Sequence, residues 1–228
     1  ATADDEHCPA MNGIYFVCQP ENLKFVAYAE HRLVRLRNVF VQSQERALFI
    51  LPKKPANIMK NLLAKNTDKV KVVFDENNAY VKTSSFEMVC RLIEGRYPNY
   101  DAVIPAENPN NATIDRVSFY AALKRVASFS NQASGLVKVQ LSENEMVVSA
   151  QDIYFSTSAE EKIVCQYTAV PLSIGFKASY LIEILSNISS ENVILQLADP
   201  SRAGVIVPTE NEEHEDLLML LMPMMLND

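Results

Sequence analysis

The sequence of 228 residues contains no tryptophan and only five glycines, and it has no long apolar run. So few glycines leave no glycine-rich loop of the kind that cradles phosphates in nucleotide-binding enzymes. The most apolar stretch, residues 217–226, is far shorter than the roughly 20 residues that a membrane-spanning helix needs. These absences argue against a nucleotide-binding enzyme of that kind and against a protein that spans a membrane.

Motifs for catalysis and metal binding are also absent. The four cysteines, Cys8, Cys18, Cys90 and Cys165, form no CxxC pair, and only three histidines could join them in a zinc site. No Ser, Cys or His stands in a nucleophile motif. Dispersed thiols favour a reducing, cytoplasmic location over a disulfide framework. We therefore expect no metal and no cofactor.

The charge is uneven along a chain of ordinary globular composition, with 48% hydrophobic and 21% charged residues. A formal net charge of −7 argues against a protein coated in nucleic acid, but it says little about one local face. Basic residues gather in the stretch 53–65, which contains no acidic residue. That stretch can therefore form a positive helix on an acidic protein.

Hydrophobic periodicity predicts a mixture of short strands and three helices. In the first half we expect strands over 14–18, 23–29, 32–37, 47–52, 69–74, 79–83 and 85–93, with a helix over 52–66 and a linker over 95–113. In the second half we expect helices over 115–131 and 177–188, with strands over 136–141, 145–150, 153–158, 162–169, 192–197, 204–208 and 217–222.

An internal repeat relates the two halves. Gly13 and a following Glu-Asn turn recur 122 residues later at Gly135 and its own Glu-Asn turn. The second helices and the strands after them also match. The sequence therefore predicts two homologous domains, 1–110 and 111–228, of which the first copy is expected to be incomplete at its N-terminal side.

The C-terminal stretch LLMLLMPMML allows two interpretations. A short apolar run is often a core strand. Pro223, however, cannot donate to a strand ladder, and a methionine-rich surface beside a free edge suits a peptide-binding groove. The residues alone favour the core strand, by about two to one.

Several motifs together resemble one family. EHRLVRL follows a hairpin, LPKK opens a helix, EGRYPNYDAVIP reaches into the predicted linker, and IGFKASYLIEIL precedes a terminal MPM. This combination resembles the bacterial DNA polymerase III beta subunit, the replicative sliding clamp, over essentially the whole chain. The resemblance implies an α+β DNA-clamp fold of two tandem homologous domains, each with antiparallel sheets and helices on one face. It matches the middle and last of the family's three domains.

The resemblance also implies function. Family members form homodimeric rings around double-stranded DNA without reading its sequence, and they hold the polymerase catalytic subunit, the clamp loader and repair proteins through short peptides. A hydrophobic cleft between the middle and last domains binds those peptides, which reverses the preference for a core strand at the C-terminus. The residues that match the cleft are Met11, His31, Arg32, Leu33, Pro98, Val103, Ala203, Leu220, Met222, Pro223, Met224, Met225 and Leu226.

Basic helix residues are the candidates for contacts to DNA phosphates. They are Lys53, Lys54, Lys60, Lys65, Arg116, Lys124, Arg125 and Lys177. For the subunit interface the resemblance points to Ser128 and Phe129, with the edge continuing into the strand 136–141. Phe119, Leu123 and Val126 form an apolar stripe on the predicted helix 115–131. Phe129 can instead be a core residue at the end of that stripe, and the resemblance favours the exposed anchor.

Two departures from the family pattern and two alternative functions remain open. The family usually has Thr-Asp-Gly before its His-Arg pair, where this chain has Tyr28-Ala29-Glu30, and Asn227 and Asp228 extend past the usual terminal leucine. The alternatives to a non-catalytic clamp are a peptide-binding scaffold unrelated to replication and an enzyme built on a duplicated α+β domain. The enzyme would need a polar pocket with paired titratable groups, for which the sequence offers no candidate.

Overall fold

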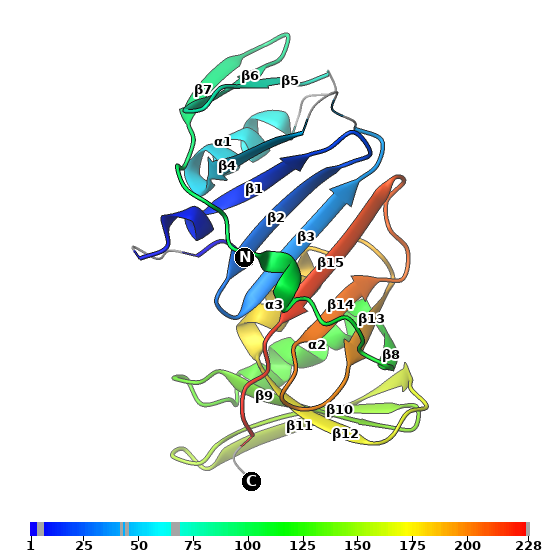
Figure 1. The fold of residues 1–228 in the computed structure, drawn as a ribbon. Coiled ribbons are helices and arrows are strands. Elements are labelled where there is room, and N and C mark those ends of the chain that lie inside the picture. The colour runs from blue at the N-terminus through cyan, green and yellow to red at the C-terminus, as the bar shows by residue number, and fades with distance from the viewer. Residues whose placement is uncertain (4–6, 42, 44–45, 65–68, 227–228) are drawn as a thin grey trace. The chain divides into compact units, whose positions relative to one another are not determined.

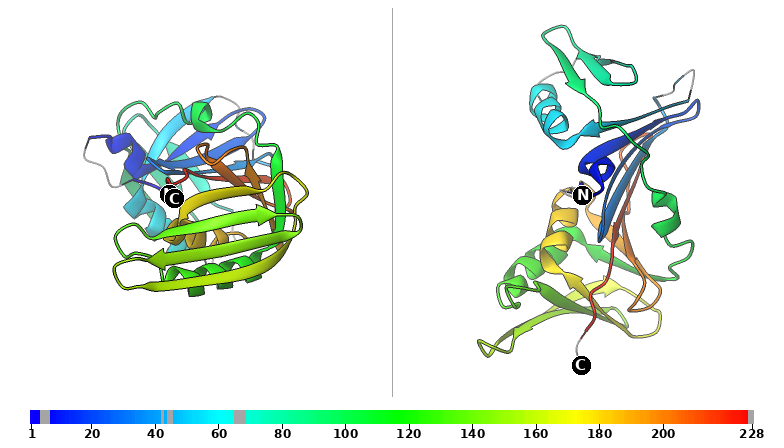
Figure 2. Two further views of the ribbon diagram at one scale, coloured as in Figure 1. Left: turned by 90° about the horizontal axis from the view of Figure 1, so that it is seen from below. Right: turned by 60° about the vertical axis from the view of Figure 1, so that its left-hand side comes forward.

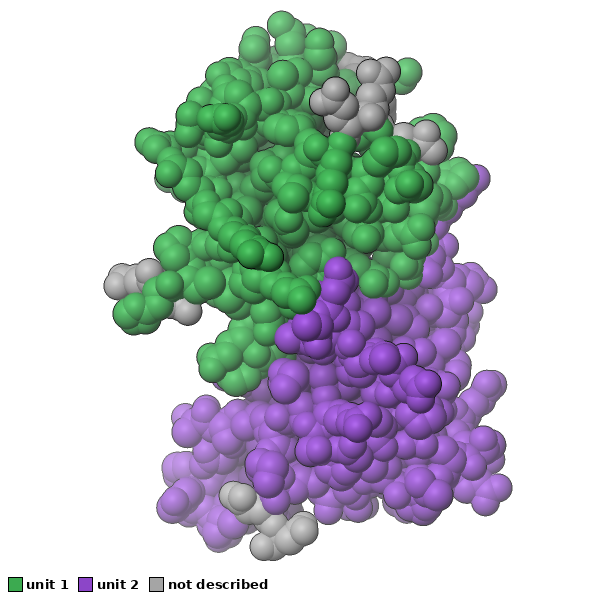
Figure 3. Space-filling model, in the orientation of Figure 1, with its two compact units in different colours: residues 1–100, 214–216 green, residues 101–213, 217–228 purple. Residues whose placement is uncertain are grey.

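A computed structural model describes residues 1–3, 7–41, 43, 46–64 and 69–226 (Figure 1). The chain divides into two compact units, which Figure 3 shows in separate colours. Unit 1 contains residues 1–100 and 214–216, and unit 2 contains residues 101–213 and 217–228. The division after Tyr100 falls earlier than the boundary predicted at residue 110.

The main sheet of unit 1 has the strand order β4-β1-β2-β3 and is antiparallel throughout. Its strands are β1 (Gly13–Cys18), β2 (Leu23–Ala29), β3 (Arg32–Asn38) and β4 (Ala47–Pro52). The predicted hairpin is confirmed, because β1 and β2 pair from Tyr15 opposite Val26 to Cys18 opposite Leu23. Asp216 also belongs to this unit, where its carboxylate lies 3.1 Å from the Arg35 guanidinium on β3.

One helix and a small sheet cover this main sheet. Helix α1 (Lys53–Leu63) directly follows β4, and the second sheet contains β5 (Lys71–Phe74), β6 (Asn78–Lys82) and β7 (Glu87–Arg91). The core between them is built from Phe49, Leu51, Ala79, Cys90 and Leu92, with Met59 of the helix packed against it. Burial of these apolar side chains is what holds the layers together.

Unit 2 is built on a larger antiparallel sheet in the order β12-β9-β10-β11-β8-β13-β14-β15. The strands are β8 (Asn110–Asp115), β9 (Leu136–Ser142), β10 (Glu145–Asp152), β11 (Thr157–Gln166), β12 (Leu172–Lys177), β13 (Asn192–Leu197), β14 (Gly204–Pro208) and β15 (Glu215–Leu221). Along β9 and β10 buried and half-buried residues alternate, as expected for a sheet with one covered face.

Helices α2 (Arg116–Ala127) and α3 (Ala178–Ser186) pack against each other and cover one face of this sheet (Figure 2). Phe119, Leu123 and Val126 of α2 are fully buried, which confirms the predicted apolar stripe. The helix begins where the Asp115 carboxylate accepts a hydrogen bond of 2.7 Å from the Ser118 amide.

The repeat is visible in the elements. Helix α3 follows β12 as α1 follows β4, yet α3 buries four residues, whereas none of residues 53–63 in α1 is buried. Ile58 and Leu62 of α1 are each 43% exposed. Within the described residues of unit 1 there is no second helix in the position that α2 occupies against α3. The two copies therefore share a plan, and the first is covered by less helix.

Two expectations about strands were wrong. Residues 153–156 form a turn and not the start of a strand, and a single strand, β11, replaces the two strands predicted over 153–158 and 162–169. The strand 136–141, expected at a subunit edge, corresponds to β9, which is paired on both sides, with β10 and β12. In the described part of the chain no helix is long and apolar enough to cross a membrane.

Candidate functional site

The C-terminal segment leaves the sheet just before the Met-Pro-Met motif. Strand β15 ends at Leu221, and the segment 222–226, here called the tail, then runs beside β12, where Met224 forms an isolated antiparallel bridge with Gly175. The Met224 amide donates to the Gly175 carbonyl at 2.8 Å. Met222 is 39% exposed and Met225 is 82% exposed. The motif is therefore a docked surface segment and not an interior strand.

A pocket of about 540 Å³ opens beside the tail, within unit 2. Its lining residues come from the tail, the start of β12, the loop before β14 and one position on β9: Lys138, Pro171, Leu172, Ser173, Asp199, Pro200, Ser201, Met224, Met225 and Leu226. Three predicted cleft residues thus meet in one pocket. Sequence reasoning missed the β12 residues and the 199–201 loop, because nothing in their local pattern shows that the tail returns to them.

The other predicted cleft residues of unit 2 do not line this pocket. Leu220 is 1% exposed and pairs with Val205, and Ala203 is 6% exposed. Val103 is half-buried at the end of a short 3-10 helix (Tyr100–Val103). Leu220 and Ala203 therefore offer almost no side-chain surface for direct contact with a ligand.

In unit 1 the predicted cleft residues occupy three segments. Met11 lies half-buried in a 3-10 helix (Pro9–Asn12), His31 and Arg32 stand at the turn between β2 and β3, and Pro98 follows Tyr97. Leu33 is fully buried. The Tyr97 hydroxyl accepts a hydrogen bond of 2.9 Å from the Tyr28 amide, so the segment before Pro98 is fixed to β2, close to that turn.

The departure at Glu30 is visible in this turn. The Glu30 carboxylate lies 3.7 Å from His31 Nε2, and both side chains are largely exposed. An acidic group next to the histidine makes the rim of the turn more polar and gives it negative charge. An exposed pair of this kind contributes little to stability.

Of the basic residues of α1, two lie at the start of the helix and one lies in its last turn. Lys53 and Lys54 occupy the first two helical positions, and Lys60, like them, is exposed. Cations at a helix N-terminus oppose the helix dipole, at a cost of roughly 0.3–1 kcal/mol each, so they do not stabilise α1. The same location attracts phosphate groups, because helix dipole and side-chain charge act together there. Lys65, the fourth lysine of this stretch, lies outside the described residues.

The basic residues around α2 and α3 make contacts within unit 2. Arg116 donates from Nε to the Ser190 carbonyl at 2.9 Å and from Nη1 to the Leu185 carbonyl at 3.2 Å. Lys124 Nζ lies 5.4 Å from the centroid of the Tyr120 ring, and Lys177 Nζ lies 5.1 Å from that of Tyr180. A DNA contact by Arg116 would have to compete with its two backbone acceptors.

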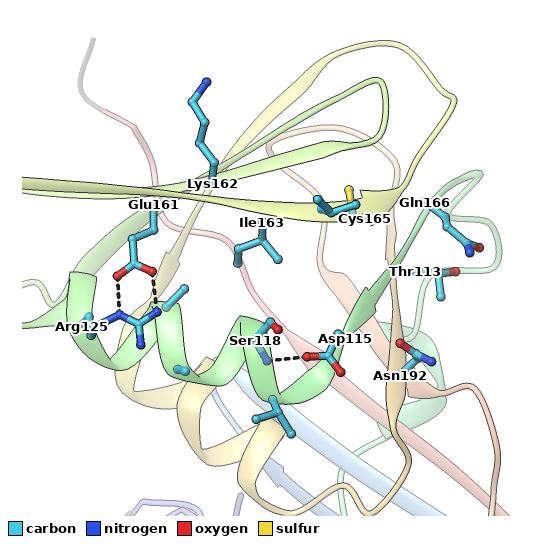
Figure 4. Close-up of a pocket in the computed structure, with 14 residues that line it drawn as sticks. Thr113, Asp115, Ser118, Arg125, Glu161, Lys162, Ile163, Cys165, Gln166 and Asn192 are labelled. Atoms are coloured by element: carbon cyan, nitrogen blue, oxygen red, sulfur yellow. Dashed lines mark hydrogen bonds and ion pairs between the residues drawn. The ribbon is translucent and has the colours of Figure 1, made fainter.

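Arg125 belongs to a groove between α2 and β11 (Figure 4). Its guanidinium makes two hydrogen bonds of 2.6 Å to the Glu161 carboxylate, which hold the pKa of that carboxyl below its usual range. The groove has a volume of about 740 Å³, and Ser118 and Ala121 of α2 are among its lining residues. The ion pair with Glu161 therefore holds the Arg125 guanidinium against β11.

The groove runs beside an open sheet edge. Of the β11 residues, only Cys165 and Gln166 pair with β8, so within the described part of the chain Thr157–Val164 has a strand neighbour on one side only. Phe129 follows the end of α2 and is 41% exposed, and Ser128 is exposed beside it. The exposed position of Phe129 agrees with an anchor more than with a core residue.

Within the described part of the chain, the cysteines and the other potential metal ligands lie apart from one another. The four cysteines are free, and burial raises the pKa of the thiols of Cys18, Cys90 and Cys165. Among the residues that the structure describes, no three His, Cys, Asp or Glu side chains are close enough together to hold a metal ion.

Two tandem antiparallel domains with helices on one sheet face define the chain as a DNA-clamp fold. The crystal structure of the Pseudomonas aeruginosa sliding clamp bound to griselimycin superimposes with a TM-score of 0.93 at 27% identity, covering 99% of this chain and 60% of that one. The chain belongs to the DNA polymerase III beta subunit family. The family's sequence model for the central domain matches residues 1–99, and its sequence model for the C-terminal domain matches residues 101–224.

Curated relatives give the same result. The beta sliding clamp of Pseudomonas aeruginosa is 28% identical over 217 residues, and that of Escherichia coli K12 is 27% identical over 216 residues. Each alignment covers 95% of this chain and 58% of the relative. The chain thus spans less than two thirds of the length of these relatives.

Proposed function

We propose that this chain is part of a sliding-clamp processivity factor, a non-catalytic cytoplasmic subunit that encircles double-stranded DNA and tethers the replicative polymerase. The match of both family models, one to each half of the chain, carries this proposal. The fold supports it, because clamp structures superimpose on 99% of the chain. No cofactor, metal or membrane enters the proposed function.

The proposed binding surface for partner peptides includes the tail. Met222 and Met225 are exposed, and Met224–Leu226 line a pocket of about 540 Å³. Methionine side chains adapt to different apolar partners, which suits a surface shared by the polymerase catalytic subunit, the clamp loader and repair proteins. The set inferred from the resemblance also includes Val103, Ala203, Leu220 and Pro223 of unit 2 and Met11, His31–Leu33 and Pro98 of unit 1.

DNA contact is proposed for the basic helix residues, foremost Lys53, Lys54 and Lys60 on the exposed start and face of α1. Attraction to phosphates without base contacts would be independent of sequence and would let a clamp slide. Lys65, Arg116, Lys124, Arg125 and Lys177 remain candidates, with Arg125 the weakest because Glu161 already holds its guanidinium.

Ring closure into a homodimer is proposed at the open edge of β11 together with Ser128 and Phe129. Unpaired backbone groups on an edge strand can accept a strand of another subunit. The groove of about 740 Å³ beneath that edge leaves room for side chains of such a strand.

The peptide proposal is tested by the double substitution Met222→Asp and Met224→Asp. Calorimetric titration with a peptide from the C-terminus of a replicative polymerase should show binding by the wild type and none by the double variant, because buried apolar anchors dominate such interfaces. Thermal unfolding of the variant should stay cooperative, since neither residue is buried in the core.

A matched control carries the same two charges elsewhere. Tyr154 and Val170 are 89% and 70% exposed, and Tyr154→Asp with Val170→Asp should leave peptide affinity unchanged. Unchanged affinity in the methionine variant contradicts the proposed surface. Binding of peptides from proteins unrelated to replication, with no binding of the polymerase peptide, would instead favour a general peptide scaffold.

A further inference from the structure

The tail is held in place by few backbone interactions. Met224 forms a single isolated bridge, while the strands of the sheet are joined by ladders of several residue pairs. Met224 N–H donates to the Gly175 carbonyl. The Met224 carbonyl oxygen lies in the space that a side chain at residue 175 would occupy. The position of the tail therefore depends strongly on the size of the side chain at residue 175 of β12.

Gly175 allows this contact because it has no side chain. A Cβ built on Gly175 would lie 2.6 Å from the Met224 carbonyl oxygen, which is closer than real Cβ contacts come. It would also lie 2.9 Å from Leu136 Cδ1 and 2.9 Å from Leu226 Cδ2. The two leucine methyl groups can rotate away, but a backbone carbonyl can move only if the tail moves with it.

The reason for glycine at this position is space and not conformation. Gly175 is not among the glycines with positive φ, which are Gly95 and Gly135. A glycine in the interior of a strand often marks a site where another backbone approaches closely. Gly204, in β14, offers a comparison: the atoms nearest to a Cβ there would be side-chain atoms, of Phe176 at 2.9 Å and of Leu197 at 3.0 Å.

We propose that Gly175 is a positioning residue for peptide binding: its bare backbone seats the tail so that Met224, Met225 and Leu226 form one wall of the pocket. This inference rests on the proposed peptide-binding function. Gly175 does not itself have to contact the peptide. It acts through the tail, whose displacement would open the pocket and move the methionines away from their partners.

The test compares Gly175→Ala with Gly204→Ala in the full chain. The probes are griselimycin and the polymerase C-terminal peptide, and calorimetry measures the affinity for each. The rate of hydrogen exchange at the Met224 amide is measured separately. Gly175→Ala should weaken both probes about tenfold or more, corresponding to about 1.4 kcal/mol, and should speed Met224 exchange at least tenfold. Gly204→Ala should lower the melting temperature while leaving affinity and Met224 exchange as in the wild type.

Each outcome can be separated. If the wild type binds neither probe, the proposed function fails, and the exchange comparison still decides whether Gly175 seats the tail. If the wild type binds and Gly175→Ala binds equally well with unchanged exchange, the inference is overturned. A lowered melting temperature with unchanged affinity and exchange would likewise reduce Gly175 to a structural role.

A second pair of variants applies if Gly175→Ala does not fold. Met224→Pro and Met224→Ala both remove the methionine side chain, but only the proline removes the N–H that donates to the Gly175 carbonyl. The proline variant should bind the probes about tenfold more weakly than the alanine variant. Equal affinities would show that the contact at Gly175 does not position the tail.

Discussion

At the scale of single residues, Tyr97 shows how one side chain fixes a segment that carries a candidate site residue. Its ring stacks on Tyr15 at a centroid distance of 4.6 Å, and its hydroxyl accepts the Tyr28 amide hydrogen bond. Burial raises the pKa of Tyr97 to about 12. The pairing of β1 with β2 begins at Tyr15 opposite Val26, and two residues further along it would bring Gly13 opposite Tyr28. The Tyr97 hydroxyl therefore accepts the Tyr28 hydrogen bond where the pairing with β1 has ended.

Replacing Tyr97 with phenylalanine should destabilise the protein by roughly 1–3 kcal/mol, because the change leaves the Tyr28 N–H without its acceptor while keeping the stacked ring. Tyr154→Phe makes the same chemical change at a side chain that is 89% exposed, so it should have almost no effect. Urea unfolding of both variants measures the difference. Equal stabilities would show that the hydroxyl is dispensable.

The pH dependence of the same variant follows from the raised pKa. A tyrosine whose pKa is higher in the folded state than its ordinary value of 10.0 contributes stability below pH 10 and loses that contribution as the pH rises toward 12. The wild type should therefore lose more stability between pH 10 and pH 12 than Tyr97→Phe, since the other tyrosines are the same in both proteins.

At the scale of elements, burial and not composition decides how much each helix contributes. Leu123 in α2 is completely buried, whereas Leu62 in α1 is 43% exposed. Both are leucines within helices, so truncating them to alanine compares the same chemical change in two environments. The comparison also tests the finding that α1 is less covered than α2.

Leu123→Ala should lower the free energy of unfolding by about 2–5 kcal/mol, because it removes buried methyl groups and leaves a cavity. Leu62→Ala should cost less than about 1 kcal/mol, since much of its side chain already contacts water. Denaturant titrations report both values. A large decrease from Leu62→Ala would mean that the face of α1 is covered in solution.

The elements also show what sequence patterns can and cannot predict. Alternation predicted β9 and β10, and helical spacing predicted the buried stripe Phe119, Leu123 and Val126, because each pattern follows directly from which face is covered. Residues 153–155 were misjudged because Ile, Tyr and Phe favour strands. In the structure the buried Asp152 carboxylate accepts hydrogen bonds from the Tyr154 and Phe155 amides and closes a turn, which leaves all three side chains exposed.

Among the candidate site residues, those in a local sequence motif were predictable and those brought in by long-range contacts were not. The sequence identified the Met-Pro-Met motif from its composition and from the resemblance, and the structure shows Met222 and Met225 exposed. It did not identify Leu172 or the 199–201 loop, because their approach to the tail is a long-range contact with no local pattern. The sequence also did not predict β12 itself, although Gly175 inside that segment is the kind of glycine that marks a close backbone approach.

At the scale of the whole molecule, the central question is how a protein with a net charge of −7 would hold DNA. Long-range repulsion between two acidic polymers must be overcome by a local positive face. Lys53, Lys54 and Lys60 supply such a face on one helix, and no acidic residue lies in its first turn. Contacts made only to phosphates also release counterions, so salt concentration should govern the affinity.

Replacing Lys53, Lys54 and Lys60 by glutamine in one triple variant should therefore weaken DNA association and reduce its dependence on salt concentration. The slope of log affinity against log salt should fall by up to about 0.9 for each phosphate that the variant no longer neutralises, as measured by fluorescence anisotropy with duplexes of unrelated sequence. Lys24, Lys71 and Lys82 lie on strands β2, β5 and β6, and the same triple neutralisation there is the matched control. It should leave the slope unchanged, because it alters net charge equally without touching α1. Equal slopes for both triple variants would place the DNA-binding face elsewhere, and tight binding that depends on DNA sequence would contradict a clamp that slides.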